Sequence, residues 1–466
     1  MSYQFCADFE TTTEENDCRV WAWSCINIFN LSHYEWGIDF ESFLKYAFRY
    51  DNAIFYFRNL KFDGEFVISY LLFHGYEWTD KRNPKGHEFT TLISDKGAFY
   101  SMKINNGGNK IELRDSMKII NLSIKDTAKA FKLPIQKGDI DYTKYRPIGY
   151  IPDDNEQEYI RYDVTIDAMS LIYFFEKGLT KMTQGSDALM DFEEIIGGKK
   201  AFRRKFPLLK RDIDDYLRKA YKGGYVYVNP ANKGKRKGHG YVLDDNSLFP
   251  SRMKFCKLPY GDPVYYEGKY KENKLMDLYV CHIRCGFKIK DGKLPTIQIK
   301  HTLSFQENEY LESSNGEIVD LYLTSVDYDL FMDHYETYSL EHIDGYMFKS
   351  KIHKEFVEYV DKWGEVKIKA SKEKNAGLRM VAKLLMNSLY GKFGLSITCR
   401  SKRPYLKNGV VHYELLEPEE RDGVYLPVAL FITAYGRYLT ITQSQKVREY
   451  SIKKLSLIHI SEPTRR

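Results

Sequence analysis

The pattern of apolar and polar positions over the first part of the 466-residue chain predicts alternating strands and helices. Short apolar runs such as AIFYF (53–57) are followed by stretches of helical periodicity such as DVTIDAMSLIYFFEKGL (163–179). Strands that alternate with helices of this length are typical of a mixed α/β domain. We therefore expect the chain to begin with an α/β domain that ends at about residue 180.

Beyond this domain the pattern is more varied. Strand and turn signals prevail over residues 259–352, residues 353–390 predict two helices, and another helix is predicted over residues 427–450. Two basic segments follow the first domain. GGKKAFRRKFPLLKR (197–211) indicates a domain boundary, and NKGKRKGHG (232–240) is typical of a flexible loop. The pattern thus predicts several domains, as the chain length also does.

The last residues, LSLIHISEPTRR (455–466), do not continue the pattern that precedes them. This string resembles translated sequencing-adapter sequence, which occurs at the ends of truncated gene models. We exclude it from the fold as a non-native tail. A natural tail is the alternative.

Composition narrows the classes of function. A hydrophobic share of 43% with 29% charged residues is that of an ordinary globular protein. The formal net charge of +6 tolerates a polyanionic partner without requiring one. The aromatic share of 15% suits stacking on nucleic-acid bases, although large aromatic cores explain it equally well.

The seven cysteines include no CxxC pair, so a structural zinc site is not expected. Cys281 and Cys285 alternate with Ile283, which predicts a strand with two buried thiols. The odd number of cysteines indicates a reducing compartment. The chain also shows no signal peptide and no run of about 18 apolar residues, so we expect a soluble, cytoplasmic protein without a membrane partner.

The segment FCADFETTT (5–13) carries the first pair of acids with a recognisable spacing. Asp8 and Glu10 are two positions apart, so on a strand both side chains point to the same face. Carboxylates are the ligands that Mg²⁺ prefers. Acids at strand ends are common, however, and this pair alone would be weak evidence for a metal site.

Two later segments supply further acids. Asn59 and Asp63 are four positions apart, as are Tyr159 and Asp163, so each pair shares one helical face. Together with the two acids of the strand, these carboxylates would hold two metal ions about 3.5–4 Å apart, the arrangement that cleaves phosphodiesters. One ion would activate the attacking water, which Tyr159 would orient, and the other would stabilise the leaving oxygen.

The segment KLLMNSLYGKFG (383–394) predicts a helix with two unlike faces. One face carries polar, basic and aromatic residues: Arg379, Lys383, Asn387 and Tyr390. The other is an apolar stripe for packing: Leu378, Val381, Leu385 and Leu389. Basic side chains suit a triphosphate, and a Tyr one turn later could stack on a base pair. A solvated helix face would explain the lysine but not the sequence NSLYG.

The segment YVLDDNSLFPSRM (241–253) predicts a buried strand that ends on the paired acids Asp244 and Asp245, followed by a sharp turn. A carboxylate at a strand end suits a metal ligand. A site of this kind usually needs a second carboxylate from elsewhere in the chain.

These motifs resemble those of family B DNA polymerases. DDNSLFP (244–250) is similar to motif A of that family and KLLMNSLYG (383–391) to its motif B, while the three acidic segments resemble the exonuclease motifs of proofreading polymerases. YKGGY (221–225), KGDIDY (137–142) and PTIQIK (295–300) resemble the protein-primed phage subgroup. The resemblance implies an RNase H-like 3′–5′ exonuclease domain followed by a right-hand polymerase domain, an α/β (mixed α+β) fold.

The resemblance also implies a division of the chain into domains. The first would be the exonuclease, and the others the palm, the fingers, two insertions of the terminal-protein region and the non-native tail. In chain order these are 1–185 (exonuclease), 186–256 (first part of the palm), 257–352 (first insertion), 353–394 (fingers), 395–423 (second insertion), 424–454 (second part of the palm) and 455–466 (tail).

For the exonuclease, the resemblance implies that four carboxylates hold two Mg²⁺ ions, or Mn²⁺ in their place: Asp8, Glu10, Asp63 and Asp163. Tyr159 would orient the attacking water, and Lys137 would stabilise the charge on the scissile phosphate. Five residues would hold the frayed 3′ end of the primer: Thr11, Asn59, Phe62, Ser116 and Met117. Of these, Met117 stands where the family usually has Leu, a small change in volume.

For the polymerase, the resemblance implies that Asp244 ligates the catalytic metals with help from the backbone carbonyl of Asp245. Phe249 stands where the family usually has the Tyr that lies under the sugar, so selection against ribonucleotides should largely survive. The motif B helix would bind the incoming nucleotide and the nascent base pair through Arg379, Lys383, Asn387 and Tyr390. Contacts to DNA would come from Tyr221, Gly223, Gly224 and, in TAYGR (433–437), Arg437.

Motif C of the family, a hairpin of the type Tyr-x-Asp-Thr-Asp that supplies the second carboxylate, is not found in this sequence. The two-metal mechanism needs acids from both strands. We therefore expect a truncated polymerase that incorporates nucleotides poorly and retains the exonuclease.

The leading hypothesis is a DNA-directed DNA polymerase with a proofreading exonuclease that replicates viral DNA in the cytoplasm of an infected cell. It would act as a monomer, with primer–template DNA, deoxynucleoside triphosphates and a terminal priming protein as partners. The alternatives are a 3′–5′ exonuclease alone and a non-catalytic DNA-binding protein.

Overall fold

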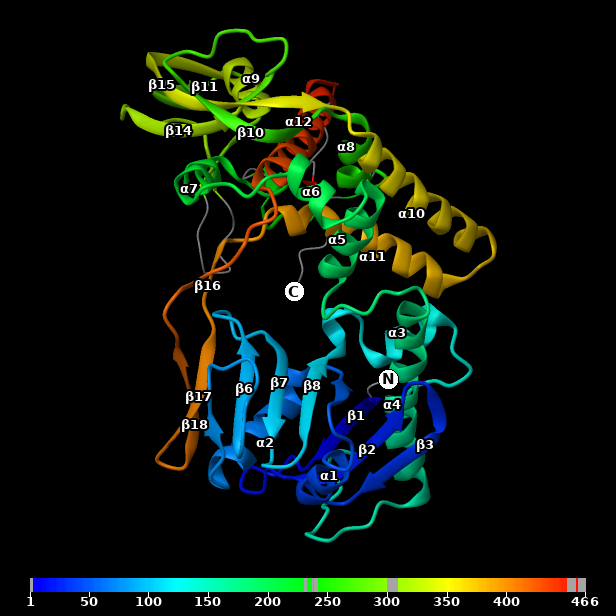
Figure 1. The fold of residues 1–466 in the computed structure, drawn as a ribbon. Coiled ribbons are helices and arrows are strands. Elements are labelled where there is room, and N and C mark those ends of the chain that lie inside the picture. Colours follow the sequence, from blue (N-terminus) through cyan, green and yellow to red (C-terminus); the bar gives the residue numbers. More distant parts are fainter. Residues whose placement is uncertain are drawn as a thin grey trace. The chain divides into compact units, whose positions relative to one another are not determined.

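The computed structural model describes residues 3–229, 233–236, 238, 242–299, 309–450 and 458–459. The chain forms two compact units, each assembled from three segments (Figure 1). The first unit consists of Met1–Asp187, Gly364–Leu385 and Ile397–Arg421, and the second of Ala188–Trp363, Met386–Ser396 and Asp422–Arg466. Both units combine helices with sheets, which confirms the predicted mixed α/β class.

An eight-stranded sheet forms the centre of the first unit, in the order β3-β2-β1-β4-β8-β7-β6-β5. The strands are β1 (Gln4–Thr11), β2 (Val20–Asn27), β3 (Asn30–Gly37), β4 (Ala53–Phe57), β5 (Glu77–Trp78), β6 (Glu88–Ile93), β7 (Phe99–Asn105) and β8 (Lys110–Asp115). Strands β1 and β8 both run parallel to β4, which lies between them. Because parallel strands end at the same edge of a sheet, the residues that follow β4 and β8 come close to the end of β1.

Helices cover both faces of this sheet. The odd-numbered β1 residues Phe5, Ala7 and Phe9 belong to an apolar core shared with α1 (Phe40–Ala47) and α2 (Leu60–Phe73). The even-numbered residues face the other way, where α4 (Asp154–Phe175) packs on β1 and β2, with α3 (Ile124–Phe131) beside it. A strand buried on both faces reads as nearly continuous apolar sequence, so the acids of β1 stand out against their neighbours.

A hairpin distant in sequence belongs to the same unit. Strands β17 (Lys402–Lys407) and β18 (Val410–Leu415) pair with each other and pack on β6 and α2. The hydroxyl of Tyr413 donates to Glu65 Oε2 at 2.5 Å, and Tyr413 also contacts the ring of Phe99. These contacts attach the hairpin to the helix that carries Asp63.

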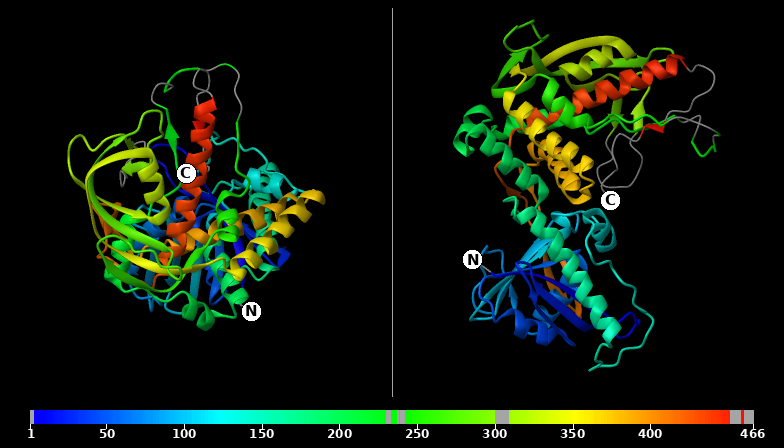
Figure 2. Two further views of the ribbon diagram at one scale, coloured as in Figure 1. Left: turned by 90° about the horizontal axis from the view of Figure 1, so that it is seen from above. Right: turned by 90° about the vertical axis from the view of Figure 1, so that its right-hand side faces the viewer.

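The second unit contains a four-stranded antiparallel sheet in the order β10-β15-β11-β14. Its strands are β10 (Leu258–Glu267), β11 (Leu278–Ile289), β14 (Val319–Thr324) and β15 (Tyr335–Lys351). The helices α7 (Arg211–Ala220), α9 (Ser325–His334) and α12 (Leu426–Tyr450) pack against it (Figure 2). As predicted, β11 buries Cys281 and Cys285.

Aromatic side chains form a second packed region in this unit. They come from α5 (Gln184–Ile196), α6 (Lys199–Lys205) and the residue that follows it, α10 (Lys354–Lys372) and α11 (Ala376–Phe393). The rings in mutual contact are Phe192, Phe202, Phe206, Phe356 and Phe393. The high aromatic content of the sequence therefore serves core packing, one of the two explanations that composition left open.

The remaining elements are short. They are η1 (Ser116–Lys118), α8 (Leu248–Phe255), β9 (Tyr227–Val228), β12 (Ile297–Ile299), β13 (Glu309–Leu311), β16 (Thr398–Cys399), β19 (Glu419–Glu420) and β20 (Ile458–His459). No helix within the described residues combines the length and apolarity needed to cross a membrane.

Several sequence predictions of local structure are confirmed. The two helices expected over 353–390 are α10 and α11, and the helix expected over 427–450 is α12. The strand-rich stretch 259–352 also contains the helix α9. The basic segment 197–211 contains α6 and the first residue of α7, and it lies inside the second compact unit, which begins at Ala188.

The strand predicted to end at Asp244 and Asp245 is wrong for the described residues 242–245, which form neither helix nor strand. Val242 is 94% exposed and Leu243 67% exposed. An apolar run becomes a buried strand only when a neighbouring strand pairs with its backbone. Part of the basic loop 232–240 and most of the tail 455–466 lie outside the described residues.

Candidate active site

Two carboxylates lie side by side on the central strand of the first unit. Asp8 and Glu10 project from the face of β1 that α4 covers, while Phe9 between them packs into the opposite core. Glu10 is 7% exposed. The alternation of side chains along a strand thus places both acids under one helix, as the sequence predicted.

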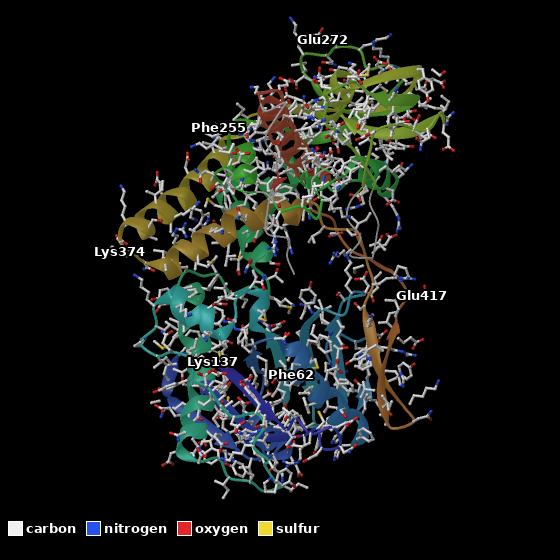
Figure 3. All side chains as sticks on the ribbon, turned by 180° about the vertical axis from the view of Figure 1, so that it is seen from behind. Phe62, Lys137, Phe255, Glu272, Lys374 and Glu417 are labelled. Carbon is white, nitrogen blue, oxygen red and sulfur yellow. The ribbon has the colours of Figure 1, made fainter. Side chains whose placement is uncertain are left out.

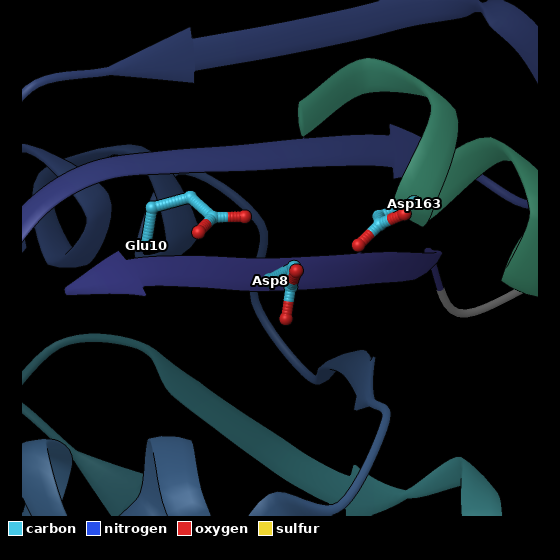
Figure 4. Close-up of side chains that lie close together, drawn as sticks. All are labelled: Asp8, Glu10 and Asp163. Atoms are coloured by element: carbon cyan, nitrogen blue, oxygen red, sulfur yellow. The ribbon is translucent and has the colours of Figure 1, made fainter. Parts of the chain in front are cut away.

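Asp163 completes a cluster of three carboxylates. It projects from α4 toward the two acids of β1 (Figure 4). One carboxylate oxygen from each of Asp8, Glu10 and Asp163 lies within 4.8 Å of the others. Three hard oxygen donors at this separation can converge on a single divalent cation.

Asp63, the fourth predicted ligand, lies in the first turn of α2 and is 2% exposed. Its Oδ1 accepts a hydrogen bond from the backbone N–H of Phe9 at 3.2 Å. It is not one of the three acids whose oxygens converge within 4.8 Å. Its charge is nevertheless close enough to contribute to the raised pKa of Asp8.

The cluster is electrostatically strained without a cation. Burial raises the pKa of Asp8, and the charges of Asp63, Glu10 and Asp163 raise it further. Burial and the charge of Asp163 raise the pKa of Glu10 to about 8, and burial raises the pKa of Asp63 to about 8. Buried like charges disfavour ionisation, so a bound divalent cation would stabilise these groups in the charged form.

Lys137 and two tyrosines border the cluster. The Nζ of Lys137 lies 2.5 Å from Asp163 Oδ2 and 5.0 Å from the centre of the Tyr159 ring. The hydroxyls of Tyr159 and Tyr142 are 2.7 Å apart. The structure therefore brings Lys137, Tyr142, Tyr159 and Asp163 together, and their roles in catalysis stay predictions.

Tyr142 is a residue that sequence reasoning missed. It ends the segment KGDIDY, which contributed to the family resemblance, but no role was assigned to it. A signal was present in the sequence, because Tyr142 lies in the same short segment as Lys137, to which a role in the site was assigned. Only the folded loop shows that its hydroxyl meets that of Tyr159.

The residues expected to hold a single strand of DNA differ in exposure. Phe62 is 51% exposed beside Phe66, at 5.7 Å between ring centres, and is available for stacking (Figure 3). Asn59 precedes α2 with a positive φ of 66°, and its N–H donates to Asp115 Oδ1 at 3.2 Å. The N–H of Met117 donates to the same oxygen at 2.9 Å. Asp115 therefore fixes both segments, and Thr11 is the last residue of β1.

Ser116 does not fit the predicted contact with DNA. Its side chain is fully buried, and its hydroxyl lies 2.7 Å from Asp167 Oδ2 and 3.2 Å from the carbonyl oxygen of Phe57. Asp167 also pairs with Arg58 at 3.2 Å. The hydroxyl therefore forms part of a buried network that joins β8 to α4, because the start of η1 points its first side chain inward.

In the second unit, Asp244 is exposed and Asp245 is half-buried. With its amide nitrogen turned toward the carboxylate, Gln443 of α12 donates to both oxygens of Asp245 at 3.2 Å. Within the described residues, the clusters of three or more metal-ligating side chains include only that of Asp8, Glu10 and Asp163. Asp244 therefore belongs to no cluster of three or more such side chains among the described residues.

Phe249 is 3% exposed and packs against Tyr390, with ring centres 4.5 Å apart. On its other side lies Gly436 of α12, where an added Cβ would sit 2.8 Å from Phe249 Cε1. The small residue therefore leaves space for the ring. Phe249 and Tyr390, from motifs A and B, meet directly in the second unit.

The predicted two-faced helix is confirmed in α11. Arg379 and Lys383 are exposed and Asn387 and Tyr390 are half-buried, whereas the apolar stripe contains the buried residues Val381, Leu385 and Leu389 and the half-buried Leu378. The spacing and polarity of its residues were enough to predict this helix and its two faces.

Arg437 is 4% exposed and is held by the protein itself. Its guanidinium pairs with Asp327 at 2.6 and 3.0 Å and donates to the carbonyl oxygens of Lys222 and Gly223, both at 2.8 Å. A direct contact of this side chain with DNA, as expected from sequence, does not fit this arrangement. Arg437 instead supports the backbone of the YKGGY turn, in which Tyr221 and Gly224 flank the two carbonyl groups that it binds.

Protein families and known proteins that are similar to this chain match it along nearly its whole length. Residues 44–162 and 153–462 match the model of DNA polymerase type B, organellar and viral. The DNA polymerase of Bacillus phage phi29 is 42% identical over 447 residues, which cover 95% of this chain and 76% of that protein. The DNA polymerase of Streptococcus phage Cp-1 is 34% identical, covering 96% of this chain and 79% of that protein.

Solved structures agree with the sequences. Phi29 DNA polymerase complexed with single-stranded DNA superposes with a TM-score of 0.90 at 40% identity, over 96% of this chain and 78% of that one. Phi29 DNA polymerase complexed with primer–template DNA and incoming nucleotide substrates gives a TM-score of 0.89, over 96% and 79% of the two chains.

Proposed function

On the premise that this chain belongs to the viral and organellar type B DNA polymerases, and among them to the protein-primed phage group, we propose where its activities reside. The chain is a DNA-directed DNA polymerase of a family that includes a proofreading 3′–5′ exonuclease. We place the exonuclease at the carboxylates of β1, α2 and α4. The observation that carries this proposal is the convergence of Asp8, Glu10 and Asp163 within 4.8 Å, beside Lys137.

The residues present fit a divalent cation. Type B polymerases generally use such ions, and Asp8, Glu10 and Asp163 are the oxygen donors that Mg²⁺ or Mn²⁺ prefers. Asp163 Oδ1 is buried without a hydrogen-bond partner among the described residues, which suits a ligand atom. Bound cations would lower the pKa of the attacking water and stabilise the leaving oxygen. We assign Asp63, whose charge reaches Asp8, to a second ion of this site.

The protein's own groups orient the substrate. Lys137 is held against Asp163, and its pKa is raised because the negative charges of Asp163 and Asp8 outweigh the effect of burial. It therefore carries a positive charge toward the scissile phosphate, where charge develops in the transition state. The hydroxyl pair of Tyr142 and Tyr159 would hold the attacking water by hydrogen bonds. Phe62, exposed at the start of α2, would stack on the terminal base.

The domain arrangement follows from the same premise. We propose an RNase H-like exonuclease over 1–185, a palm from 186–256 and 424–454, and fingers over 353–394. The four-stranded sheet within 257–352 would be the first insertion, and the segment 395–423, which includes the β17–β18 hairpin, the second.

For nucleotide incorporation we propose that Asp244 and the carbonyl of Asp245 hold the catalytic cations. Phe249, packed against Tyr390, would lie under the sugar of the incoming nucleotide. Arg379 and Lys383 would bind the triphosphate. The nascent base pair would lie against Asn387 and Tyr390, and the template strand against Tyr221, Gly223 and Gly224.

The partners are proposed from the relatives. Phi29 polymerase is described in complexes with primer–template DNA and incoming nucleotides, and we propose the same ligands for this chain. A terminal protein as primer, action as a monomer and a place of action in the cytoplasm of the infected host complete the proposal.

The exonuclease is tested with single-stranded DNA labelled at its 5′ end. We expect a ladder of products shortened from the 3′ end with Mg²⁺ or Mn²⁺, and no products with a chelator. The polymerase is tested by extension of a labelled primer on a template with the four deoxynucleotides. Intact DNA after incubation with Mg²⁺ would contradict the exonuclease, and a primer of unchanged length would contradict nucleotide incorporation.

A further inference from the structure

A long irregular loop brings two of the site residues to the carboxylates. Residues 132–153, between α3 and α4, contain neither helix nor strand. Lys137 and Tyr142 both lie in this loop, and each must meet a partner on α4. Loops of this length without secondary structure are usually either functional or disordered. Because no helix or sheet hydrogen bonds order this loop, side-chain contacts must fix its conformation.

Arg146 is the side chain that ties the loop together. It is 2% exposed, although arginine is almost never fully buried unless it is paired. Its Nη2 donates to the carbonyl oxygen of Asp141 at 2.8 Å, and its Nη1 to that of Lys144 at 3.0 Å. The guanidinium thus closes the loop on itself next to Tyr142.

The same guanidinium anchors the loop to the first turn of α4. Its Nε and Nη2 donate to Glu156 Oε1 at 3.2 and 2.9 Å. The other oxygen of Glu156 accepts from the Tyr150 hydroxyl at 2.5 Å and from the Asp153 N–H at 3.1 Å, as part of a capping box. Glu156 is therefore held by contacts that do not involve Arg146.

An aromatic surface completes the buried site of Arg146. The guanidinium carbon lies 4.3 Å from the centre of the Trp21 ring on β2, and Trp21 also contacts the ring of Tyr150. Trp21 is 2% exposed. A planar cation that stacks on a ring while donating in its own plane uses properties that lysine lacks.

We propose that Arg146 is a positioning residue for the exonuclease. It fixes the carbonyls of Asp141 and Lys144 relative to α4 and β2, and so sets where Lys137 and Tyr142 stand. It donates no hydrogen bond to the carboxylate cluster, although its positive charge acts to lower the pKa of Glu10. It acts on Lys137 and Tyr142 through the loop, and Arg146→Lys, which keeps the charge, separates this role from the electrostatic one. This proposal rests on the exonuclease function proposed above.

The geometry favours this role over a purely stabilising one. Two of the acceptors of Arg146 are loop carbonyls that have no share in the sheet or in the helix. Losing these bonds frees the loop, while β1 and α4 keep their own backbone pairing. A displacement of about 1 Å in a positioned group is enough to cost about 100-fold in rate.

The test compares Arg146→Lys and Arg146→Met with a matched control, Lys144→Met. Lys144 belongs to the same loop and contacts the same acid, Glu156, at 3.2 Å, but it holds no loop carbonyl. We expect both Arg146 variants to lose about 10–100-fold in kcat on single-stranded DNA. The Mn²⁺ concentration for half-maximal activity should stay within about twofold, and the control should keep its kcat within about threefold.

Hydrogen exchange supplies a readout that a general loss of stability would not reproduce. In the Arg146 variants the amides of residues 137–145 should exchange at least about tenfold faster, with β1 and α4 unchanged. Guanidinium ion at tens of millimolar, with sodium as the control, should restore part of the activity of Arg146→Ala.

The outcomes separate the two proposals. A wild-type chain that leaves single-stranded DNA intact contradicts the proposed exonuclease itself. An active wild type with Arg146→Lys and Arg146→Met equally active contradicts the positioning role alone. Faster exchange throughout the first unit would also contradict it, since that result assigns Arg146 to the scaffold.

Discussion

The carboxylates of β1 and those at residues 244 and 245 are both acid pairs next to apolar residues in sequence, yet the fold treats them differently. Asp8 and Glu10 lie on a strand paired on both sides and covered by helices. Asp244 is exposed on a segment without regular structure, after the exposed Val242 and Leu243. The difference shows that an acid pair becomes a buried site only where paired strands hold its backbone.

The free-energy cost of placing the carboxylates also differs between the two regions. Around β1 the fold holds buried like charges whose pKa values are raised, and Phe5, Phe9 and their core neighbours offset this cost on the opposite face. Binding a cation would convert the repulsion into affinity. At residue 244 solvent already hydrates the carboxylate, so a cation gains less from binding there.

The largest effect should come from the double variant Asp8→Ala/Glu10→Ala. Removing a residue that only hydrogen-bonds to a metal ligand lowers metal affinity or activity about 10–100-fold. Losing two of the ligands themselves should therefore lower the rate of digestion of single-stranded DNA at least about 1,000-fold. The measurement is the rate of release of labelled nucleotide with Mg²⁺. Glu15→Ala, an exposed acid just after the same strand, is the control and should keep the wild-type rate. Undiminished digestion by the double variant would remove β1 from the site.

The reverse experiment replaces Asp244 by Ala. Nucleotide incorporation at a primer end should fall at least about 100-fold, because the cations lose a carboxylate ligand. Digestion of single-stranded DNA should remain within about twofold, since the β1 cluster is complete without Asp244. Both activities are measured on the same preparation. An equal loss of digestion would mean that the two regions do not act independently.

Phe62→Ala tests whether an exposed ring near the first region binds DNA. Stacking of a base on an aromatic ring is worth about 1–3 kcal/mol, so KM for single-stranded DNA should rise about 5–150-fold, with a smaller change in kcat. Phe29→Ala is the matched control, because Phe29 is also exposed, at 60%, but follows β2 at a turn. Equal effects of the two variants would assign Phe62 to general surface binding.

A smaller effect concerns stability without DNA. Asp8→Asn should raise the melting temperature in chelator by relieving charge repulsion, and should weaken the rise that Mn²⁺ gives the wild type. That rise reflects about 2.7 kcal/mol at a hundredfold excess over Kd. Asp244→Asn should leave the melting temperature in chelator unchanged, because the carboxylate is exposed. Calorimetry of the three proteins decides whether only the β1 cluster carries strain.

The smallest effect should come from a buried acid outside the carboxylate cluster. It tests whether burial alone, without neighbouring carboxylates, raises a pKa and destabilises the fold. Asp187 is 1% exposed and lies apart from both regions in sequence, and burial raises its pKa to about 7. Between its unfolded value of about 4 and 7, the folded protein binds the extra proton, so this acid destabilises the fold as pH rises through that window. Asp187→Asn avoids the charge. Its melting temperature relative to wild type should therefore rise between about pH 4 and pH 7 and level off above. A difference independent of pH would contradict this cause.

Local pattern alone was enough for several features. The polar and apolar faces of α11 follow from residue period, and the shared face of Asp8 and Glu10 from strand alternation. The spacing of Tyr159 and Asp163 gave one helical face of α4. These predictions succeeded because the geometry of a single element depends on neighbours a few positions away.

Predictions that depended on the surroundings of a residue were less successful. Ser116 and Arg437 were assigned to DNA by their motifs, whereas the structure shows both side chains buried and bonded to Asp167 and Asp327 respectively, so their contact with DNA stays a prediction. The strand before Asp244 was inferred from two apolar residues that turn out to be exposed. Burial is a property of what packs on a residue, and a motif does not encode it.

By itself the sequence determined which residues could do chemistry, namely acids, a lysine and tyrosines at spacings that fit one strand and two helices. The tertiary structure alone decided which of them meet: Asp8 with Asp163, 155 positions later, Tyr142 with Tyr159, and Arg146 with Trp21. The physical reason is that spacing fixes direction within an element. The convergence of carboxylates against their mutual repulsion requires parallel strands ending at one edge and a helix packed across them.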